Sequence, residues 1–256
     1  MQPVNPKKSL GQHFLVDKNI AKKIIESIET GNFKTLIEIG PGTGILTDFL
    51  VDRFENYKAV EIDKESYDFL CENYPVQKNR FILTDFLKFN LNKEKAPIAL
   101  IGNLPYYISS QILFKVLEGR NVVNQIVCMV QKEVAERISS PPGSKKYGIL
   151  SVLLQAYFSI EYLFTVHEHC FSPSPKVKSG VIRLKRNNTA ELECDPDIFI
   201  KIVKATFNQR RKTIKNSLRS IFLTLPSESE LLTERPEQLT VSQFVALTLL
   251  IQKLNH

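Results

Sequence analysis

The sequence contains no apolar run long enough to cross a membrane. Its most apolar run, FVALTLLI at residues 244–251, is far shorter than the roughly 20 residues that a membrane-spanning helix needs. The first residues, MQPVNPKKS, also lack the apolar segment of a secretory signal. We therefore expect a protein without membrane attachment, located in the cytoplasm.

The cysteines have no spacing typical of a disulfide framework or a zinc site. Cys71, Cys128, Cys170 and Cys194 lie far apart in the chain and form no C-x-x-C pair. Without a secretory signal, this distribution indicates reduced thiols. The segment HEHC, residues 167–170, offers metal-binding side chains but has no partner cluster, so we predict no metal site.

Acidic residues are missing from one long stretch near the C-terminus. The whole chain has a net charge of +7, which favours an anionic partner, although it could also serve solubility alone. Residues 201–219 contain seven Lys or Arg and no Asp or Glu. A solvated helix face usually mixes both signs, because opposite charges four residues apart attract each other. The stretch therefore suggests a polyanion as its partner.

If this basic stretch is one helix, its cations share a face. Arg211, Lys215 and Arg219 follow one another at four-residue spacing, which places them in one stripe. Ile214, Leu218 and Ile221 then turn toward the protein. Such a stripe can follow phosphates without reading a sequence. The candidate docking residues are Arg210, Arg211, Lys212, Lys215 and Arg219.

Short β-rich runs alternate with helical patterns from Thr35 onward. Near-continuous apolar runs, each followed by an amphipathic helix, predict an α/β fold with a parallel sheet covered on both faces. The last two runs are joined by a Ser-Pro-Ser-Pro turn, so we expect one antiparallel strand at the edge of the sheet. The predicted strands are 35–40, 57–63, 80–85, 98–103, 124–130, 161–171 and 176–186, and the clearest helices are 44–54, 64–74 and 147–158.

A polar stretch divides the chain. Residues 185–197, KRNNTAELECDPD, separate the α/β part from a tail whose pattern is wholly helical. We predict an α/β domain over residues 1–187 and a small helical docking domain over residues 188–256. The sequence shows no internal repeat and no low-complexity segment.

The first strand ends in a glycine-rich turn, IEIGPGTGILT. Gly40, Gly42 and Gly44 would let the backbone approach a ligand closely, and the next helix would present free N–H groups. Glu61 ends the next strand, 21 residues after Gly40, where a carboxylate can accept hydrogen bonds from both ribose hydroxyls. NAD and other adenosine cofactors all fit this pattern.

Two features argue against a dinucleotide in this turn. Thr47 stands where the G-x-G-x-x-G pattern begun at Gly42 needs its last glycine, and its branched side chain would obstruct close helix packing. Glu38 places a carboxylate near the site of a pyrophosphate, which like-charge repulsion disfavours. The same carboxylate suits a ligand with an ammonium and a sulfonium, so we predict S-adenosylmethionine. Asp85, after the third strand, would accept from the adenine amine, cap the next helix, or do both.

The run IGNLPYYIS, residues 101–109, contains no charged group. Taken alone, it is ordinary turn material, since Pro fixes its φ angle and Asn bonds its own backbone. It follows the fourth strand, however, and open α/β sheets bind ligands beyond the carboxyl ends of their strands. Next to a methyl donor, Asn-Leu-Pro-Tyr is similar to the motif of methyltransferases that modify exocyclic amines of nucleobases.

The chemistry of an exocyclic amine explains why no charged base is needed. The lone pair of adenine N6 is delocalised into the ring until its hydrogens are pulled out of the ring plane. The Asn103 side-chain oxygen and the Leu104 carbonyl, exposed by the Pro105 turn, could accept these hydrogens. Tyr106 could stack on a base swung out of its helix. Phe171, in a turn stiffened by prolines, is the candidate for the other face of the base, and burial in the core is its alternative.

Motifs along nearly the whole chain carry a resemblance to one family. They are KKSLGQHFLVD, IEIGPGTGILT, VEID, GNLPYYISS, KYGILSVLLQ, FSPSPKVKSG and FNQRRKTIKNSLR, in this order. In them the chain resembles the KsgA family of small-subunit ribosomal RNA adenine N6,N6-dimethyltransferases. The resemblance implies a Rossmann-like class I S-adenosylmethionine-dependent methyltransferase domain with an antiparallel edge strand, followed by a small all-helical C-terminal domain.

The resemblance also implies a reaction. Four methyl groups pass from S-adenosylmethionine to N6 of two adjacent adenosines in the 3′-terminal hairpin of small-subunit (16S) rRNA, leaving S-adenosylhomocysteine and using no metal. The partner would be an immature ribosomal subunit, and we expect a monomeric enzyme. By the family's pattern, the N-terminal segment of the α/β domain forms a lid over the cofactor. His13 and Leu15 then join Gly40, Glu61, Asp85 and Asn103 around it.

Two other interpretations stay open. The related Erm group modifies large-subunit rRNA, although FNQRRKTIKNSLR and KYGILSVLLQ resemble the KsgA family more closely. A methyltransferase fold can also serve a non-catalytic RNA-binding, ribosome-assembly or transcription factor. The intact run Asn103 to Tyr106, together with Glu61 and Asp85, favours retained activity.

Overall fold

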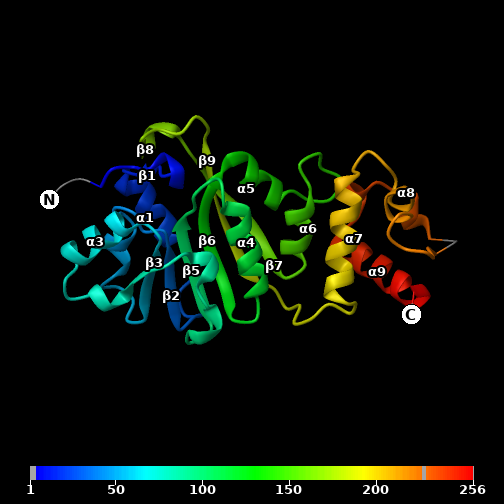
Figure 1. Ribbon diagram of the computed structural model, residues 1–256, viewed down its shortest axis with the longest axis horizontal. Coiled ribbons are helices and arrows are strands. Elements are labelled where there is room, and N and C mark those ends of the chain that lie inside the picture. Colours follow the sequence, from blue (N-terminus) through cyan, green and yellow to red (C-terminus); the bar gives the residue numbers. More distant parts are fainter. Residues whose placement is uncertain (1–3, 227–228, 256) are drawn as a thin grey trace. The chain divides into compact units, whose positions relative to one another are not determined.

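The computed structural model describes residues 4–226 and 229–255 of the chain. This part contains a seven-stranded sheet (Figure 1). Its strands are β2 (Thr35–Ile39), β3 (Tyr57–Glu61), β4 (Phe81–Leu83), β5 (Ile98–Asn103), β6 (Val123–Gln131), β7 (Phe158–Val166) and β9 (Ser179–Arg186). They lie in the order β4-β3-β2-β5-β6-β9-β7.

Burial on both faces explains why these segments are strands. Every residue of β2 is buried, and so is every residue of β5 except Asn103. β4, β3, β2, β5 and β6 pair in parallel, and such strands must be apolar on both sides. β9 runs antiparallel to β6, and β7 lies outside it. The predicted antiparallel strand is thus present at this end of the sheet.

The helices around the sheet begin where the sequence offers caps. Asp17 starts the first of them, because its side chain accepts from the backbone N–H groups of Asn19 and Ile20 at 2.8 and 3.2 Å. The predicted helix 44–54 is shorter in the structure. The helices of this part are α1 (Lys18–Glu26), α2 (Thr47–Leu50), α3 (Lys64–Asn73), α4 (Ser109–Glu118) and α5 (Lys132–Ser139), and short 3-10 helices lie at Lys8–Leu10, Lys78–Arg80, Phe86–Lys88, Leu91–Lys93 and Glu168–Cys170.

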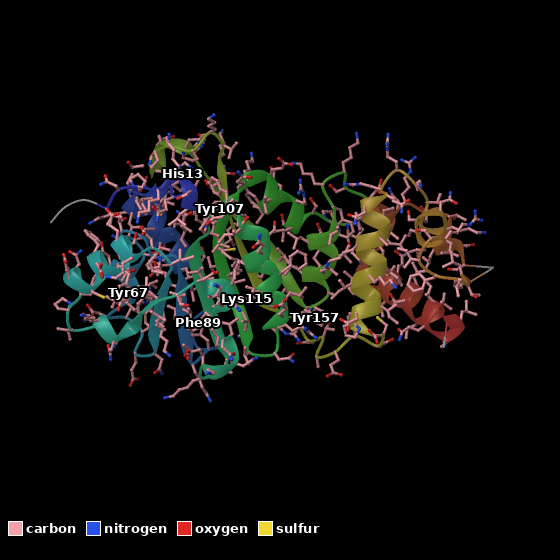
Figure 2. All side chains as sticks on the ribbon, viewed as in Figure 1. His13, Tyr67, Phe89, Tyr107, Lys115 and Tyr157 are labelled. Atoms are coloured by element: carbon pink, nitrogen blue, oxygen red, sulfur yellow. The ribbon has the colours of Figure 1, made fainter. Side chains whose placement is uncertain are left out.

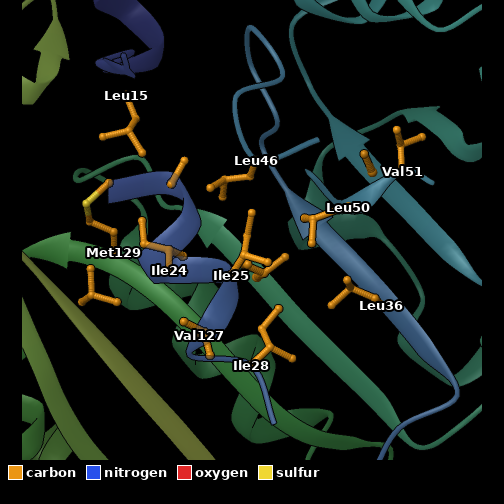
Figure 3. Close-up of a cluster of buried hydrophobic side chains, with 14 of the residues drawn as sticks. Leu15, Ile24, Ile25, Ile28, Leu36, Leu46, Leu50, Val51, Val127 and Met129 are labelled. Atoms are coloured by element: carbon orange, nitrogen blue, oxygen red, sulfur yellow. The ribbon is translucent and has the colours of Figure 1, made fainter. Parts of the chain in front are cut away.

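The hydrophobic core under α1 fixes the position of this helix. Ile24 and Ile25 of α1 belong to one buried cluster with Val127 and Met129 of β6 (Figure 3). Each of these side chains is at most 3% exposed, and full burial of one such side chain stabilises the fold by about 1.5–3 kcal/mol. Because α1 is anchored in this way, the C-terminal end of the segment before it is held in place.

That preceding segment is paired with the second half of the chain. β1 (Phe14–Leu15) and β8 (Phe171–Ser172) form a two-stranded antiparallel sheet. Leu15 faces Phe171 in this pair, and the N–H of Val16 donates to the carbonyl of Cys170 at 2.9 Å. The N-terminal segment is therefore held by backbone bonds at its end.

The chain divides into two compact units. The first, which we call the sheet unit, contains the residues up to Ala135 together with Ile160–Arg186. The second, the helical unit, contains Glu136–Ser159 and the chain from Asn187 onward. The predicted domain boundary at residue 187 cuts the chain only once. It therefore leaves the excursion Glu136–Ser159 in the α/β domain, whereas this segment belongs to the helical unit. This excursion joins the helical unit through contacts such as the 3.0 Å bond from the Asn187 N–H to the Tyr157 carbonyl.

The helical unit is built around a long amphipathic helix. That helix, Pro196–Asn208, contacts three others, and Phe199 and Phe244 are fully buried in this unit. The helices are α6 (Ile149–Gln155), α7 (Pro196–Asn208), α8 (Ile214–Leu218) and α9 (Val241–Asn255), with 3-10 helices at Glu230–Leu232 and Pro236–Gln238. Among residues 4–226 and 229–255, no helix has the length and apolar character needed to span a bilayer.

Candidate active site

A pocket lies at the carboxyl ends of β2, β3, β4 and β5, where open α/β sheets bind their ligands. The loops after these strands and residues 10–15 of the N-terminal segment form its walls. It has about 970 Å³ of empty volume, open solvent at its mouth included, which suits a nucleoside-sized ligand. Predicted residues in its walls are His13, Leu15, Glu38, Gly40, Gly42, Glu61, Asp85, Asn103, Leu104, Pro105 and Tyr106.

The glycine turn after β2 needs glycine for two reasons. Gly40, Gly42 and Gly44 have φ angles of +63°, +56° and +83°, which other residues rarely adopt. A Cβ at Gly42 would also come within 2.9 Å of the Phe14 ring. The turn is therefore shaped by its own backbone and is covered by the N-terminal segment.

Glu61 ends β3 and turns its carboxylate toward backbone N–H groups. Its Oε2 accepts from Gly42 at 3.0 Å, and its Oε1 accepts from Ile62 and Asp63 at 2.9 and 2.8 Å. Burial raises the pKa of Glu61, and these bonds oppose part of the rise. A carboxylate has about four acceptor positions, so three are used and one remains. Accepting both ribose hydroxyls, as predicted from the sequence, would require one backbone bond to move.

Glu38 lies beneath the glycine turn and is almost fully buried. Its Oε2 accepts from the Thr47 hydroxyl at 2.9 Å and from the hydroxyl of Tyr57. Burial raises the pKa of Glu38 to about 7, because the two hydroxyl bonds offset it only in part. Thr47, which in the sequence argues against NAD, therefore also holds this carboxyl group in place. A cation bound nearby would favour its ionised form.

Asp85 follows β4 and caps a short helix. Its Oδ1 accepts from the Leu87 N–H at 2.9 Å, and the residue also lines the pocket. The cap predicted as its alternative role is thus present. Capping through Oδ1 leaves Oδ2 as the acceptor for a ligand amine.

Asn103, the last residue of β5, has a side chain whose orientation is set by a backbone group. Its Nδ2 donates to the His13 carbonyl at 2.9 Å. Since a carbonyl oxygen can only accept, the amide must present its nitrogen to His13 and its Oδ1 to the other side. The next residue, Leu104, donates its N–H to the Met129 carbonyl at 3.0 Å. Asn103 therefore brings a fixed acceptor to the pocket wall.

Tyr106 is held at its ring and at its hydroxyl. Its ring centroid lies 5.7 Å from that of His13, with 26° between the planes. Its hydroxyl is 2.6 Å from the hydroxyl of buried Ser179, and burial raises the pKa of Tyr106. Neighbouring Tyr107 also lines the pocket and is 56% exposed. Figure 2 shows His13 and Tyr107 in the same region of the sheet unit.

Phe171 is buried in the core, which is the alternative that the sequence left open. It is 5% exposed and belongs to the hydrophobic cluster that also contains Leu15. Pairing of β1 with β8 covers the ring, although Pro173 stiffens the turn that follows. Phe171 is not among the described residues that line the pocket. Contact with a base at Phe171 remains a prediction that requires the β1–β8 pair to move.

The basic stretch is not a single helix. α7 ends at Asn208, the Lys212 N–H donates to the Gln209 carbonyl at 2.8 Å in a turn, and α8 starts at Ile214. The predicted stripe at four-residue spacing is therefore wrong, because Arg211 lies in this turn. Ile214 and Leu218 are fully buried as predicted, whereas Ile221 is only half-buried. Arg211, Lys212, Lys215 and Arg219 are all exposed.

Arg210 differs from its neighbours because it serves the helical unit. Its guanidinium donates to the Ser144 carbonyl at 3.2 Å and lies 3.5 Å from a Glu237 carboxylate oxygen. It also lies over the Phe207 ring, 6.0 Å from the centroid. These contacts leave Arg210 the least suited of the five candidates to contact phosphate.

The HEHC segment has no metal-binding geometry. Its two imidazoles, His167 and His169, stack with centroids 5.7 Å apart. Across residues 4–226 and 229–255, no three His, Cys, Asp or Glu side chains are grouped as metal ligands would be.

The sheet topology and the pocket define a Rossmann-like class I S-adenosylmethionine-dependent methyltransferase. The fold is similar to that of a dimethyladenosine transferase from Plasmodium falciparum, with a TM-score of 0.79 and 22% identity over 94% of this chain and 98% of that one. It is also similar to the 23S rRNA methyltransferase ErmE, with a TM-score of 0.69 and 26% identity over 92% of this chain and 99% of that one.

The sequence comparisons are more specific. The model of the ribosomal RNA adenine dimethylase family matches residues 4–247. The ribosomal RNA small subunit methyltransferase A of Bacteroides thetaiotaomicron is 52% identical over 252 residues, which cover 97% of this chain and 94% of that protein. The chain therefore belongs to the ribosomal RNA adenine dimethylase family, and the resemblance seen in its motifs is confirmed.

Proposed function

We propose that this protein dimethylates N6 of two adjacent adenosines in the 3′-terminal hairpin of small-subunit rRNA, using S-adenosylmethionine. The observation that carries the proposal is the fixed amide of Asn103, whose nitrogen is bonded to His13 so that its oxygen is free to accept. The name of the Bacteroides relative supports the small subunit as the substrate. The proposal includes an immature subunit as partner, a monomeric enzyme and a cytoplasmic location.

The residues of the pocket fit S-adenosylmethionine by their donor and acceptor types. Glu61 and Asp85 each keep an acceptor for the hydroxyl and amine groups of an adenosine. Glu38 also lines the pocket, and its Oε2 accepts the hydrogen bonds from Thr47 and Tyr57. Its Oε1 is therefore the oxygen that the cationic methionine group of the cofactor would meet. The open backbone at Gly40, where a Cβ would meet nothing within 4 Å, leaves room for the ligand.

The mechanism requires orientation and fixed dipoles. S-adenosylmethionine supplies an electrophilic methyl group. Asn103 Oδ1 and the Leu104 carbonyl accept the two N6 hydrogens, which draws the lone pair out of conjugation and aims it at that methyl group. Tyr106 supports the base from a ring fixed by Ser179. An amide suits this place better than a carboxylate, since a carboxylate would also pair with the cationic donor. Transfer of the methyl group would break its bond to sulfur and leave S-adenosylhomocysteine, and the proton would then pass from N6 to the solvent at the mouth of the pocket.

The direct test is incubation with labelled S-adenosylmethionine and undermethylated small ribosomal subunits, followed by nucleoside analysis. We expect label in N6,N6-dimethyladenosine of small-subunit rRNA. Large subunits serve as the control, because label there would favour the activity named for ErmE. The absence of transfer to either subunit, with substrate bound, would favour a non-catalytic factor.

Asn103→Ala should reduce turnover on the order of a hundredfold to a thousandfold, because one preorganised acceptor is lost. The measurement is the rate of methyl transfer at saturating cofactor and subunit. Binding titrations provide the control, since both substrates should still bind. Turnover close to that of the wild type would exclude the proposed role of Asn103.

A further inference from the structure

The carboxylate of Asp63 binds the N-terminal segment. It follows β3 and is 4% exposed. One oxygen accepts from the Lys7 ammonium, and the other accepts from Gln12 Nε2 at 3.2 Å and from Ser66 Oγ at 3.1 Å. Two of these three partners belong to the strap, a name that we give to residues 7–15.

Asp63 stands where a helix cap is expected but makes no cap bond. It is the residue before the first turn of α3, and an Asp at that position usually accepts from the backbone N–H groups of the helix. Its side chain makes no such bond. Glu65, in the first turn of the same helix, also contacts the strap, with an oxygen 3.4 Å from Lys7 Nζ. The start of α3 is therefore built to hold the strap.

The same residue is connected to the cofactor site. The N–H of Asp63 donates to Glu61 Oε1 at 2.8 Å. On the strap, residues 10–15 line the pocket, and Gln12 is both a pocket residue and a partner of Asp63. The far end of the strap is held separately, by the bond from Asn103 to His13 and by β1. The strap is thus fastened on two sides of the pocket.

We propose that Asp63 is a positioning residue that clamps the strap over bound S-adenosylmethionine and so sets how fast this cofactor leaves. The inference rests on the proposed function, which supplies the ligand. Loss of the clamp frees only the Lys7 side of the strap, because the His13 side keeps its own bonds. The cofactor would therefore be released faster while the rest of the pocket stays assembled.

The charge state of the clamp supports this role at neutral pH. Burial acts to raise the pKa of Asp63, but the hydrogen bonds from Lys7, Gln12 and Ser66 outweigh it, and the pKa lies below its ordinary value. Asp63 therefore stays ionised opposite the Lys7 ammonium. A charged pair of this kind holds better than neutral partners would.

The test compares Asp63→Asn and Lys7→Gln with a matched pair on the same helix. Lys64 and Asp68 form an exposed ion pair four residues apart on α3, so Lys64→Gln and Asp68→Asn remove similar charges without touching the strap. The dissociation rate of S-adenosylmethionine is measured by displacement with S-adenosylhomocysteine. Thermal unfolding of each ligand-free variant is measured beside it.

We expect each clamp variant to release the cofactor roughly tenfold faster, about the effect of losing one charge-assisted hydrogen bond. The loss in the double variant should be smaller than the sum of the two single losses, because both changes break the contact between Lys7 and Asp63. It can exceed each single loss, since Lys7 also contacts Glu65 and Asp63 also accepts from Gln12. Control variants should release the cofactor at the wild-type rate.

Wild-type release rates in both clamp variants, with cofactor binding intact, would overturn the clamp alone. A lower unfolding temperature without faster release would also overturn it, since that is the result expected of a residue that only stabilises the fold. A wild-type protein that binds no S-adenosylmethionine would overturn the proposed function and the clamp with it.

Discussion

Phe171 shows how one residue can separate a structural role from a catalytic one. Because the ring is buried in the cluster with Leu15, Phe171→Ala should lower the free energy of unfolding by about 3–5 kcal/mol. Phe171→Leu keeps most of the volume and should cost much less. Urea unfolding followed by circular dichroism measures both values.

The opposite result at Phe171 would be equally informative. An alanine variant that folds as stably as the wild type, but binds its RNA substrate about 1–3 kcal/mol more weakly, would show a ring that stacks on the base. In that case the β1–β8 pair would have to open when RNA binds. Substrate affinity at fixed cofactor concentration distinguishes the two roles.

Glu38 should give the protein a characteristic dependence of stability on pH. Burial raises the pKa of Glu38 to about 7 from an ordinary value of 4.5, so the folded protein holds this proton more tightly than the unfolded chain does. Stability therefore falls as the pH rises between these two values, by roughly 3 kcal/mol in total. Glu38→Gln, which keeps the shape and cannot titrate, should lack this part of the decline.

The measurement is the free energy of unfolding at several pH values from 5 to 8, for the wild type and Glu38→Gln. Glu61 is also buried, and its raised pKa contributes a decline of the same sign to both proteins. The difference between the two curves isolates Glu38. Parallel curves would mean that Glu38 titrates normally in the folded protein.

At the scale of elements, substitutions in the glycine turn test whether the strap packs against that turn. Gly40 and Gly42 have similar positive φ angles, but only a Cβ at Gly42 would collide with Phe14. Gly40→Ala should therefore cost roughly 1–2 kcal/mol of unfolding free energy from backbone strain. Gly42→Ala should cost more, because the strap must also move.

The collision makes a specific double variant informative. Phe14→Ala removes the ring that the new Cβ would meet, so it should recover part of the loss in Gly42→Ala and none of the loss in Gly40→Ala. Unfolding free energies of the single and double variants provide the comparison. Additive losses at both glycines would show that the strap does not press on the turn.

The elements that the sequence predicted are those with strong local patterns. β2 and β5 were readable because they are apolar on both faces, and the Asn103 run was readable because it ends such a strand. The break between α7 and α8 was not readable, because no Gly or Pro marks the turn at Arg211. The helical pattern of apolar residues continues through residues 209–213, although backbone hydrogen bonds hold these residues in a turn.

The residues that the sequence did not reveal act through long-range contacts. The Asp63 carboxylate accepts from Lys7, the Tyr57 hydroxyl donates to Glu38, and the hydroxyls of Ser179 and Tyr106 share a hydrogen bond. Each of these contacts joins segments whose proximity is decided only when the sheet forms. Burial of Phe171 depends in the same way on β1 pairing with β8. A motif therefore identifies a functional group more readily than the groups that hold it.

For the whole molecule, the candidate residues for cofactor binding and for RNA docking lie in different units. Every residue that lines the pocket lies before Ala135, in the sheet unit. The exposed cations of the α7–α8 turn and α8 lie in the helical unit. Cofactor binding and docking to RNA should therefore respond to different substitutions.

Changing Arg211, Lys212, Lys215 and Arg219 together to Glu should weaken binding to the small ribosomal subunit strongly and flatten its salt dependence. If these side chains contact single-stranded phosphates, each lost contact should reduce the log–log slope by about 0.7. Arg210 is left unchanged, because its contacts with Ser144 and Glu237 support the fold. Cofactor affinity should stay at the wild-type value.

Titrations of subunit and of cofactor at several salt concentrations separate these effects from a general change in charge. The matched control is a variant with four exposed lysines of the sheet unit changed to Glu, namely Lys78, Lys88, Lys93 and Lys95. It has the same net charge but keeps the helical unit intact, so its salt slope should fall far less. An equal loss of affinity in both variants would mean that net charge alone attracts the RNA, because long-range attraction does not depend on where the charges lie.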